Sequence, residues 1–136
     1  MTADAAADLV ASHRKLGWRV MLVAAVLGLT LEGLHGFKVP LYVDVSNETR
    51  RLMWTLAHAH GILLGLVNVA FAASLDAAGV ATARRASPWL RAATVVLPAG
   101  FFLGGCFVHG GDPGLPVLLV PFGAAALLGA LAILAR

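Results

Sequence analysis

Four long apolar segments follow one another along this chain, and short polar stretches separate them. They cover residues about 16–39, 52–75, 89–108 and 117–135. Each segment is close to the ~20 residues that a helix needs to cross the hydrocarbon core of a bilayer. A helix is the expected conformation, because lipid offers no partner for backbone polar groups. The pattern predicts an all-α integral membrane protein, a four-helix bundle that forms a single four-span domain over residues 1–136.

The composition agrees with a membrane protein and argues against a soluble one. Hydrophobic types make up 60% of the 136 residues and charged types only 12%, whereas soluble domains carry about a quarter charged residues. The net charge of +3 does not indicate a nucleic-acid-binding protein, because the basic residues sit at the ends of apolar segments and form no basic stripe. We therefore expect the lipid bilayer, and no nucleic acid, as a partner.

The basic residues are divided unequally between the two sides of the predicted spans. One side has seven and the other has three. The larger group is Arg14, Lys15, Arg19, Arg84, Arg85, Arg91 and Arg136, and the smaller group is Lys38, Arg50 and Arg51. The positive-inside rule places the larger group, and with it both termini, in the cytoplasm. We expect a multi-pass protein of a bacterial-type inner (plasma) membrane.

Small residues and prolines suggest how the spans begin and pack. Residues 1–12 are small and acidic, so we expect a short cytoplasmic arm before the first span. Pro88 is expected in the first turn of the third span, where its missing N–H costs nothing. Two small-xxx-small patterns predict close helix–helix contacts. They are Gly61/Gly65 and Gly100/Gly104.

Ionisable residues inside the spans gather near the predicted outer face. Such residues are costly in a membrane and mark functional sites. At 1.5 Å per residue, His35 lies roughly 6 Å and His58 roughly 9 Å inside the outer ends of their spans. Glu32 lies one turn deeper than His35, His60 lies close to His58, and His109 ends the third span. We expect this histidine and glutamate cluster to face the outside of the membrane.

The spacing within the cluster restricts which side chains can meet. Glu32 and His35 are three residues apart, so both lie on one helical face. His58 and His60 are two residues apart, about 200° around a helix, so they cannot point at one centre. Asn68 stands alone in mid-span and is expected to hydrogen-bond across helices, whereas His13 is expected at the opposite membrane edge.

Four histidines at one depth favour a transition metal or haem, because imidazole binds copper, zinc and iron well. His35, His109 and one of His58 and His60 would be ligands, with Glu32 as a further ligand or a carboxylate that orients one. A proton relay and purely structural hydrogen bonding are the alternatives. The catalytic residues are unknown, since no nucleophile and base stand out, and whether the chain is an enzyme stays open.

The segment WTLAHAHGILLGLVN, which contains His58 and His60, resembles the histidine-bearing helices of the haem–copper oxidase superfamily and of related small haem- or copper-binding membrane proteins. The Glu32/His35 pattern is similar to that of four-helix haem bundles such as haem A synthase halves. The resemblance covers single helices. It implies a compact haem- or copper-binding bundle, and the copper-ligand and tyrosine motifs of a complete oxidase are missing.

The leading hypothesis is therefore a membrane-embedded bundle that binds haem or a transition metal and serves electron transfer or metal handling. A second hypothesis is a small oligomeric proton-coupled transporter or channel that uses the same cluster. A third is an accessory subunit of a larger membrane complex. In each case we expect a homo-oligomer or a larger assembly.

Overall fold

The computed structural model describes residues 3–44, 47–75 and 79–136, and it is helical throughout its regular structure. Four helical segments are long and apolar enough to cross a membrane, as predicted, and the fourth, Leu115–Leu134, combines a short 3-10 helix with an α-helix. The α-helices are Ala3–Gly36 (α1), Thr49–Ala73 (α2), Val80–Cys106 (α4) and Leu119–Leu134 (α5), and the 3-10 helix, η1, is Leu115–Leu118. These features are compatible with a multi-pass membrane protein.

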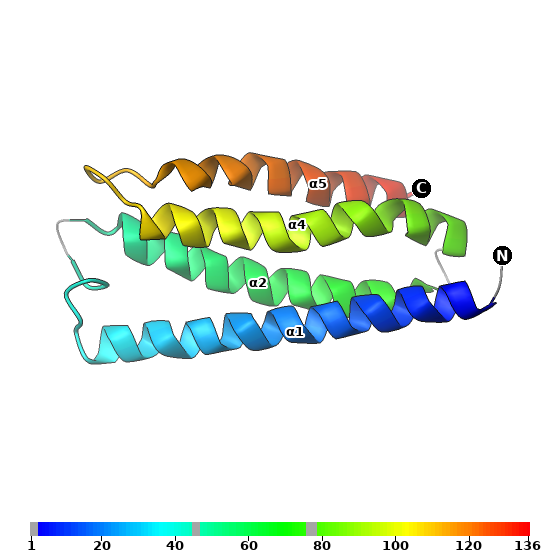
Figure 1. The fold of residues 1–136 in the computed structure, drawn as a ribbon, viewed down its shortest axis with the longest axis horizontal. Coiled ribbons are helices and arrows are strands. Elements are labelled where there is room, and N and C mark those ends of the chain that lie inside the picture. The colour runs from blue at the N-terminus through cyan, green and yellow to red at the C-terminus, as the bar shows by residue number, and fades with distance from the viewer. Residues whose placement is uncertain (1–2, 45–46, 76–78) are drawn as a thin grey trace.

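The helices are antiparallel and pack in the order of the chain. α1 packs on α2, α2 on α4, and α4 on α5, whereas α1 and α4 meet over only a few residues. Both termini lie at one end of the molecule, which we call the termini end (Figure 1). The α1–α2 and α4–α5 connections lie at the opposite end, which we call the loop end (Figure 1). α1 and α5 therefore form the two edges of the arrangement.

Two helices begin earlier than the hydropathy pattern predicts. α1 starts at Ala3, so the expected arm over residues 1–12 is helical in its described part. α4 starts at Val80, and Pro88 lies inside the helix and not in its first turn. Tertiary packing explains the difference, because both added segments contribute apolar side chains to one core, and such packing overrides local signals.

This core lies toward the termini end. It is formed by buried residues at and just after the end of α2 and in α4 and α5, with side chains from the first turns of α1 packed against it. Its buried members are Phe71, Leu75, Ala83, Ala86, Leu90 and Ala130. The termini end is thus closed by apolar packing, and the two pockets described below lie further toward the loop end.

The predicted glycine contacts are present. A Cβ atom on Gly65 would lie 2.9 Å from the carbonyl oxygen of Gly17, so α1 and α2 touch through their backbones there. Gly61 packs against the next turn of α1. The second glycine pair performs the same role against η1 and the start of α5. Its members are Gly100 and Gly104.

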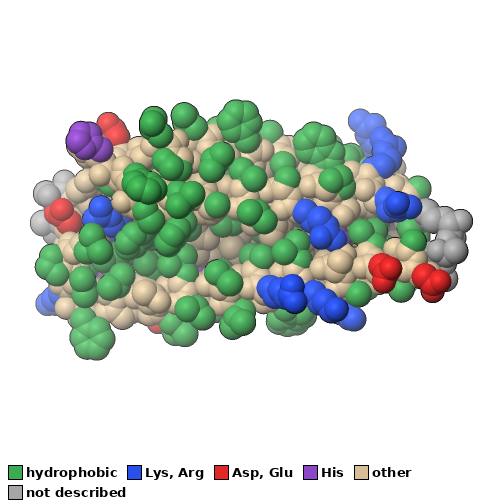
Figure 2. Space-filling view, viewed as in Figure 1, with side chains coloured by type: hydrophobic (Ala, Val, Ile, Leu, Met, Phe, Trp, Pro, Cys, Tyr) green, Lys and Arg blue, Asp and Glu red, His purple; other side chains and the backbone are tan. Residues whose placement is uncertain are grey.

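The surface is apolar along most of its length. Many large hydrophobic side chains are exposed, Val23, Leu29 and Phe122 among them. On the face shown in Figure 2, Lys and Arg side chains gather mainly toward the termini end. The basic residues, which are unequally divided along the sequence, are therefore also unequally distributed between the two ends of the molecule.

Candidate functional site

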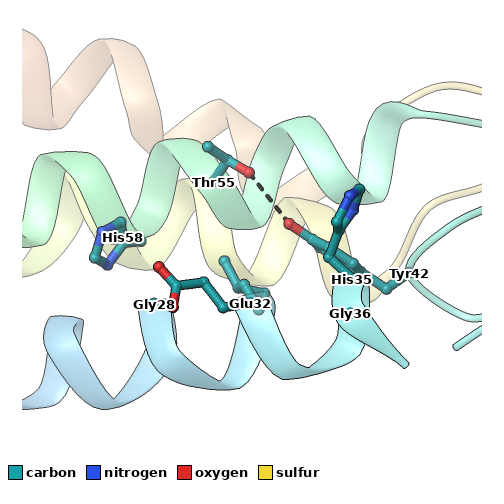
Figure 3. A pocket seen from close by; sticks show the side chains of 8 residues that line it. Gly28, Glu32, His35, Gly36, Tyr42, Thr55 and His58 are labelled. Carbon is teal, nitrogen blue, oxygen red and sulfur yellow. Dashed lines mark hydrogen bonds between the residues drawn. The ribbon is translucent and has the colours of Figure 1, made fainter. Parts of the chain in front are cut away.

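Three of the five predicted site residues line one pocket near the loop end. Glu32 and His35 come from α1 and His58 comes from α2. Tyr42 and Thr55 complete its polar lining, and the cavity volume is about 350 Å³ (Figure 3). We call this cavity the Glu32 pocket. The i, i+3 spacing places Glu32 and His35 on the pocket side of α1 together, as predicted.

His58 is held in a defined orientation by the backbone of α1. Its Nδ1 lies 2.7 Å from the carbonyl oxygen of Ala24. A carbonyl can only accept, so Nδ1 carries the hydrogen, and Nε2 keeps a free lone pair in the neutral ring. Gly28 makes room for the ring, since a Cβ there would lie 2.6 Å from Nδ1. His58 therefore presents one nitrogen that can accept a proton or bind a cation.

Glu32 has no hydrogen bond and no ion pair with any residue in the described part of the chain. The residue is exposed, although it lies in a helix that can span a membrane. In Figure 3 its carboxylate extends along α1 toward His58. A carboxylate in this setting is costly unless it is protonated, paired or covered by another chain.

Aromatic packing forms the loop-end wall of the pocket. The rings of His35 and Tyr42 meet edge to face, with centroids 6.5 Å apart. Tyr42 is only 6% exposed and stacks with Trp54 at 6.3 Å, while its hydroxyl lies 3.5 Å from the Thr55 hydroxyl (Figure 3). The structure shows that it fixes one side of the site.

The other two predicted residues point elsewhere. His60 packs against Phe101 of α4, with ring centroids 4.8 Å apart, and its Nδ1 bonds the Leu56 carbonyl at 2.8 Å. This divergence from His58 agrees with their 200° separation. His109 is exposed in the α4–α5 connection, where its backbone pairs with Asp112. The histidines were predicted at one depth, but their side chains do not converge on one point.

The described residues contain no group of three or more His, Cys, Asp or Glu side chains that could hold a metal ion. The five predicted residues therefore do not form one set of ligands within the described part of the chain. Depth alone cannot bring ligands together, because side chains at the same level of a helix can point in opposite directions. Of the predicted cluster, only Glu32, His35 and His58 share one pocket in the structure.

A second polar site, at the level of Asn68, was missed at the sequence level. His13 is completely buried between α1, α2 and α4. Its Nδ1 lies 2.7 Å from Asn68 Oδ1 and its Nε2 lies 2.8 Å from Ser87 Oγ. The amide oxygen can only accept, so Nδ1 donates to it, and the neutral Nε2 accepts from the Ser87 hydroxyl.

The hydrogen bonds around His13 continue on both sides, from Asn68 and from Ser87. Asn68 Nδ2 donates to the Thr94 hydroxyl at 2.7 Å, and Thr94 donates to a backbone carbonyl of its own helix. Arg91 donates to Ser87 and, at 2.6 Å, to Ser12 of α1. No buried side-chain polar atom of the described residues lacks a partner. This His13 network therefore ties three helices together and leaves no group free for a ligand.

The predicted cross-helix hydrogen bonding of Asn68 is confirmed, but its partner was not foreseen. The first span was expected to begin after His13, so this residue was placed at the membrane edge. In the structure α1 begins at Ala3, and the contact between His13 and Asn68 places both residues at the same level of the bundle. A solitary buried amide is the signal that a polar partner lies at its level.

No family model, curated protein or solved structure matches this chain.

Proposed function

We propose that this chain is a small proton-coupled membrane transporter or channel that works as an oligomer, with Glu32 and His58 as its proton-exchanging site. One observation carries the proposal: an exposed, unpaired carboxylate shares a pocket with an imidazole whose Nε2 is free. Intramembrane Asp, Glu and His residues commonly form proton relays.

The depth of Glu32 supports a position within the bilayer. It lies fourteen residues after Trp18, whose 61% exposed side chain suits a membrane interface. That separation is about 21 Å along the helix, less than the roughly 30 Å hydrocarbon core. A lone charge facing lipid costs about 2.5–3.5 kcal/mol at the centre of the bilayer, and Glu32 would lie roughly 6 Å from that centre. Protonation, or cover by a second copy packed along α1, removes that cost.

The chemistry of the site follows from its donors and acceptors. Neutral His58 accepts a proton on Nε2, because Nδ1 keeps its hydrogen on the Ala24 carbonyl. Ionised Glu32 is an acceptor, and His35 adds a second imidazole at the loop-end side. A proton that enters at His35 can therefore be passed between groups that each bind and release it. A cationic substrate would compete with the proton for Glu32.

Proton flux into proteoliposomes tests the proposal. Vesicles with an internal pH dye receive a potassium diffusion potential, and the protein is compared with Glu32→Gln and with Glu48→Gln. Glu48 is an exposed carboxylate outside the Glu32 pocket. We expect Glu32→Gln to lower the protein-dependent flux at least about tenfold and Glu48→Gln to leave it unchanged. Equal flux in all three proteins would overturn the proposal.

A transition metal or haem is the second candidate, and the orientation of His58 favours it. Metal-ligating histidines usually donate their other N–H to a carboxylate or a backbone carbonyl, as His58 does to Ala24. His35 and Glu32 would supply further ligands, completed by a second copy. Elemental analysis and oxidised and dithionite-reduced spectra of detergent-purified protein test this candidate. A Soret band or stoichiometric metal lost in His35→Ala supports it, and their absence after growth with both available rejects it.

The orientation is part of the same proposal. The concentration of Lys and Arg toward the termini end supports cytoplasmic termini in a bacterial-type plasma membrane, with the Glu32 pocket near the outer face (Figure 2). Reporter fusions to the C-terminus check this, since a cytoplasm-specific reporter should be active and a periplasm-specific one inactive.

A further inference from the structure

A second cavity of about 590 Å³ lies between α1 and α4, with α2 as its floor, and it shares no lining residue with the Glu32 pocket. Its walls are almost entirely apolar, with Val23 and Leu27 on one side and Pro98 and Phe102 on the other. Small residues make the floor deep. They are Ala57 and Gly61 of α2, with Ala24 of α1 beside them. We call this cavity the α1–α4 groove.

One charged residue lines the groove, and it lies toward the termini end. Arg19 is exposed and has no hydrogen bond or ion pair with any described residue. Lys15, four residues earlier, is exposed on the same face of α1 and also has no described partner. No carboxylate lines the groove. Its charged end is therefore purely cationic.

We propose that the α1–α4 groove binds one acyl chain of an anionic glycerophospholipid, whose phosphate is held by Arg19. Guanidinium groups bind phosphate through two parallel charge-assisted hydrogen bonds. The neighbouring Trp18 marks the level of the membrane interface, which is where a lipid phosphate lies. The cationic end favours an anionic headgroup, because a zwitterionic one would bring its ammonium group to a site without a carboxylate.

The length of the groove matches one leaflet. Its α1 wall runs from Arg19 to Thr30, twelve residues with eleven rises of 1.5 Å between them, which is about 16 Å. Half of a hydrocarbon core of roughly 30 Å is about 15 Å. A chain whose phosphate rests on Arg19 would thus reach the middle of the bilayer at the far end of the groove.

The His13 network limits the groove at the termini end. Arg91 of α4 donates to Ser12 of α1 at 2.6 Å and so holds the two helices together on the termini side of Arg19. α1 and α4 meet over only a few described residues, which leaves the groove between them open to lipid from the side. This proposal does not depend on the function of the Glu32 pocket.

Native mass spectrometry of the full chain tests the proposal with two lipids of matched acyl chains, phosphatidylglycerol and phosphatidylcholine. We expect one phosphatidylglycerol per chain to be retained in preference to phosphatidylcholine. Arg19→Gln should weaken that retention about tenfold, the loss expected for one charge-assisted contact. Arg14→Gln removes an exposed charge outside the groove and is the matched control.

A second pair of variants tests the groove itself. Ala99→Phe fills the groove from α4, whereas Ala125→Phe adds the same ring to an exposed position on α5. We expect only the first to lower lipid retention, with unchanged helix content by circular dichroism. Equal retention of the two lipids, or equal effects of Arg19→Gln and Arg14→Gln, would overturn the proposal. So would an Ala99→Phe variant that changes the oligomeric state but retains the lipid, since a second copy would then occupy the groove.

Discussion

The two ends of the α1–α2 pair differ in how completely their polar side chains are hydrogen-bonded. At the His13 network, one imidazole, one amide, three hydroxyls and a guanidinium are joined, and the imidazole is fully buried. At the Glu32 pocket, the carboxylate is exposed and unpaired in the described part of the chain, and His58 uses only one of its nitrogens.

Because of this difference, we expect the His13 network to serve stability and the Glu32 pocket to serve chemistry. A buried network with every partner in place rigidifies the fold, and it has no capacity left for a ligand. An incomplete site costs stability, and it persists where a proton, a ligand or a partner chain completes it. Substitutions at the two ends should therefore have opposite effects on stability and on activity.

The largest loss of stability is expected from His13→Ala. The substitution leaves Asn68 and Ser87 without their partner and opens a cavity beside Phe71, whose ring centroid lies 4.5 Å from that of His13. We expect a loss of roughly 2–4 kcal/mol, measured by denaturation in mixed micelles. His109→Ala, at an exposed histidine, is the control and should change stability little. Equal stabilities of the two variants would contradict the structural role of the network.

Gly17→Ala is expected to have the next largest effect. The new Cβ would lie 2.6 Å from the Gly65 carbonyl oxygen, so α1 and α2 must move apart near the network. Overpacking of this kind costs about 1–3 kcal/mol. Gly33→Ala, on the same helix with nothing within 4 Å, should be neutral or slightly stabilising. A Gly33 variant as unstable as the Gly17 variant would mean that helix packing is not the cause.

Gly28→Ala should affect activity more than stability. A Cβ at this position would lie 2.6 Å from His58 Nδ1 and would displace the ring from the Ala24 carbonyl. We expect a stability loss of about 1 kcal/mol for the hydrogen bond and a clear fall in proton flux. Gly33→Ala serves as the control again. Unchanged flux would show that the orientation of His58 is irrelevant to transport.

The smallest effect is expected from Glu48→Gln at the loop end. Glu48 forms an ion pair with Arg51 at 2.7 Å, but its side chain is 64% exposed. Exposed pairs contribute at most about 1 kcal/mol and often nothing measurable. We expect a change in unfolding free energy within about 0.5 kcal/mol. A larger loss would show that the loop end contributes more to stability than its packing indicates.

The sequence predicted what depends on hydropathy and on position around a helix. The four spans, the glycine contacts and the divergence of His58 from His60 follow from composition and from 3.6 residues per turn. The start of α1 did not follow, because packing against a distant core decides whether residues 3–15 are helical. The place of His13 was missed for the same reason.

The sequence also did not predict which residues share the Glu32 pocket. Glu32, His35 and His58 share a pocket because α1 packs on α2 through small residues, and this contact sets the rotation of each helix. His109 was predicted at their depth but belongs to a turn beyond α4. Tyr42 enters the pocket from a connection whose path no periodicity describes. Depth can be read from a sequence, whereas helix rotation and loop paths require the tertiary structure.

The most direct test of the proposed proton exchange at Glu32 is a pH-difference infrared spectrum of the protein reconstituted in lipid. We expect a carboxylic acid C=O band that appears as the pH falls, that is absent in Glu32→Gln and that persists in Glu48→Gln. A spectrum in which Glu32→Gln retains every carboxyl band of the unsubstituted protein would show that Glu32 exchanges no proton, and would contradict its role as the functional carboxylate.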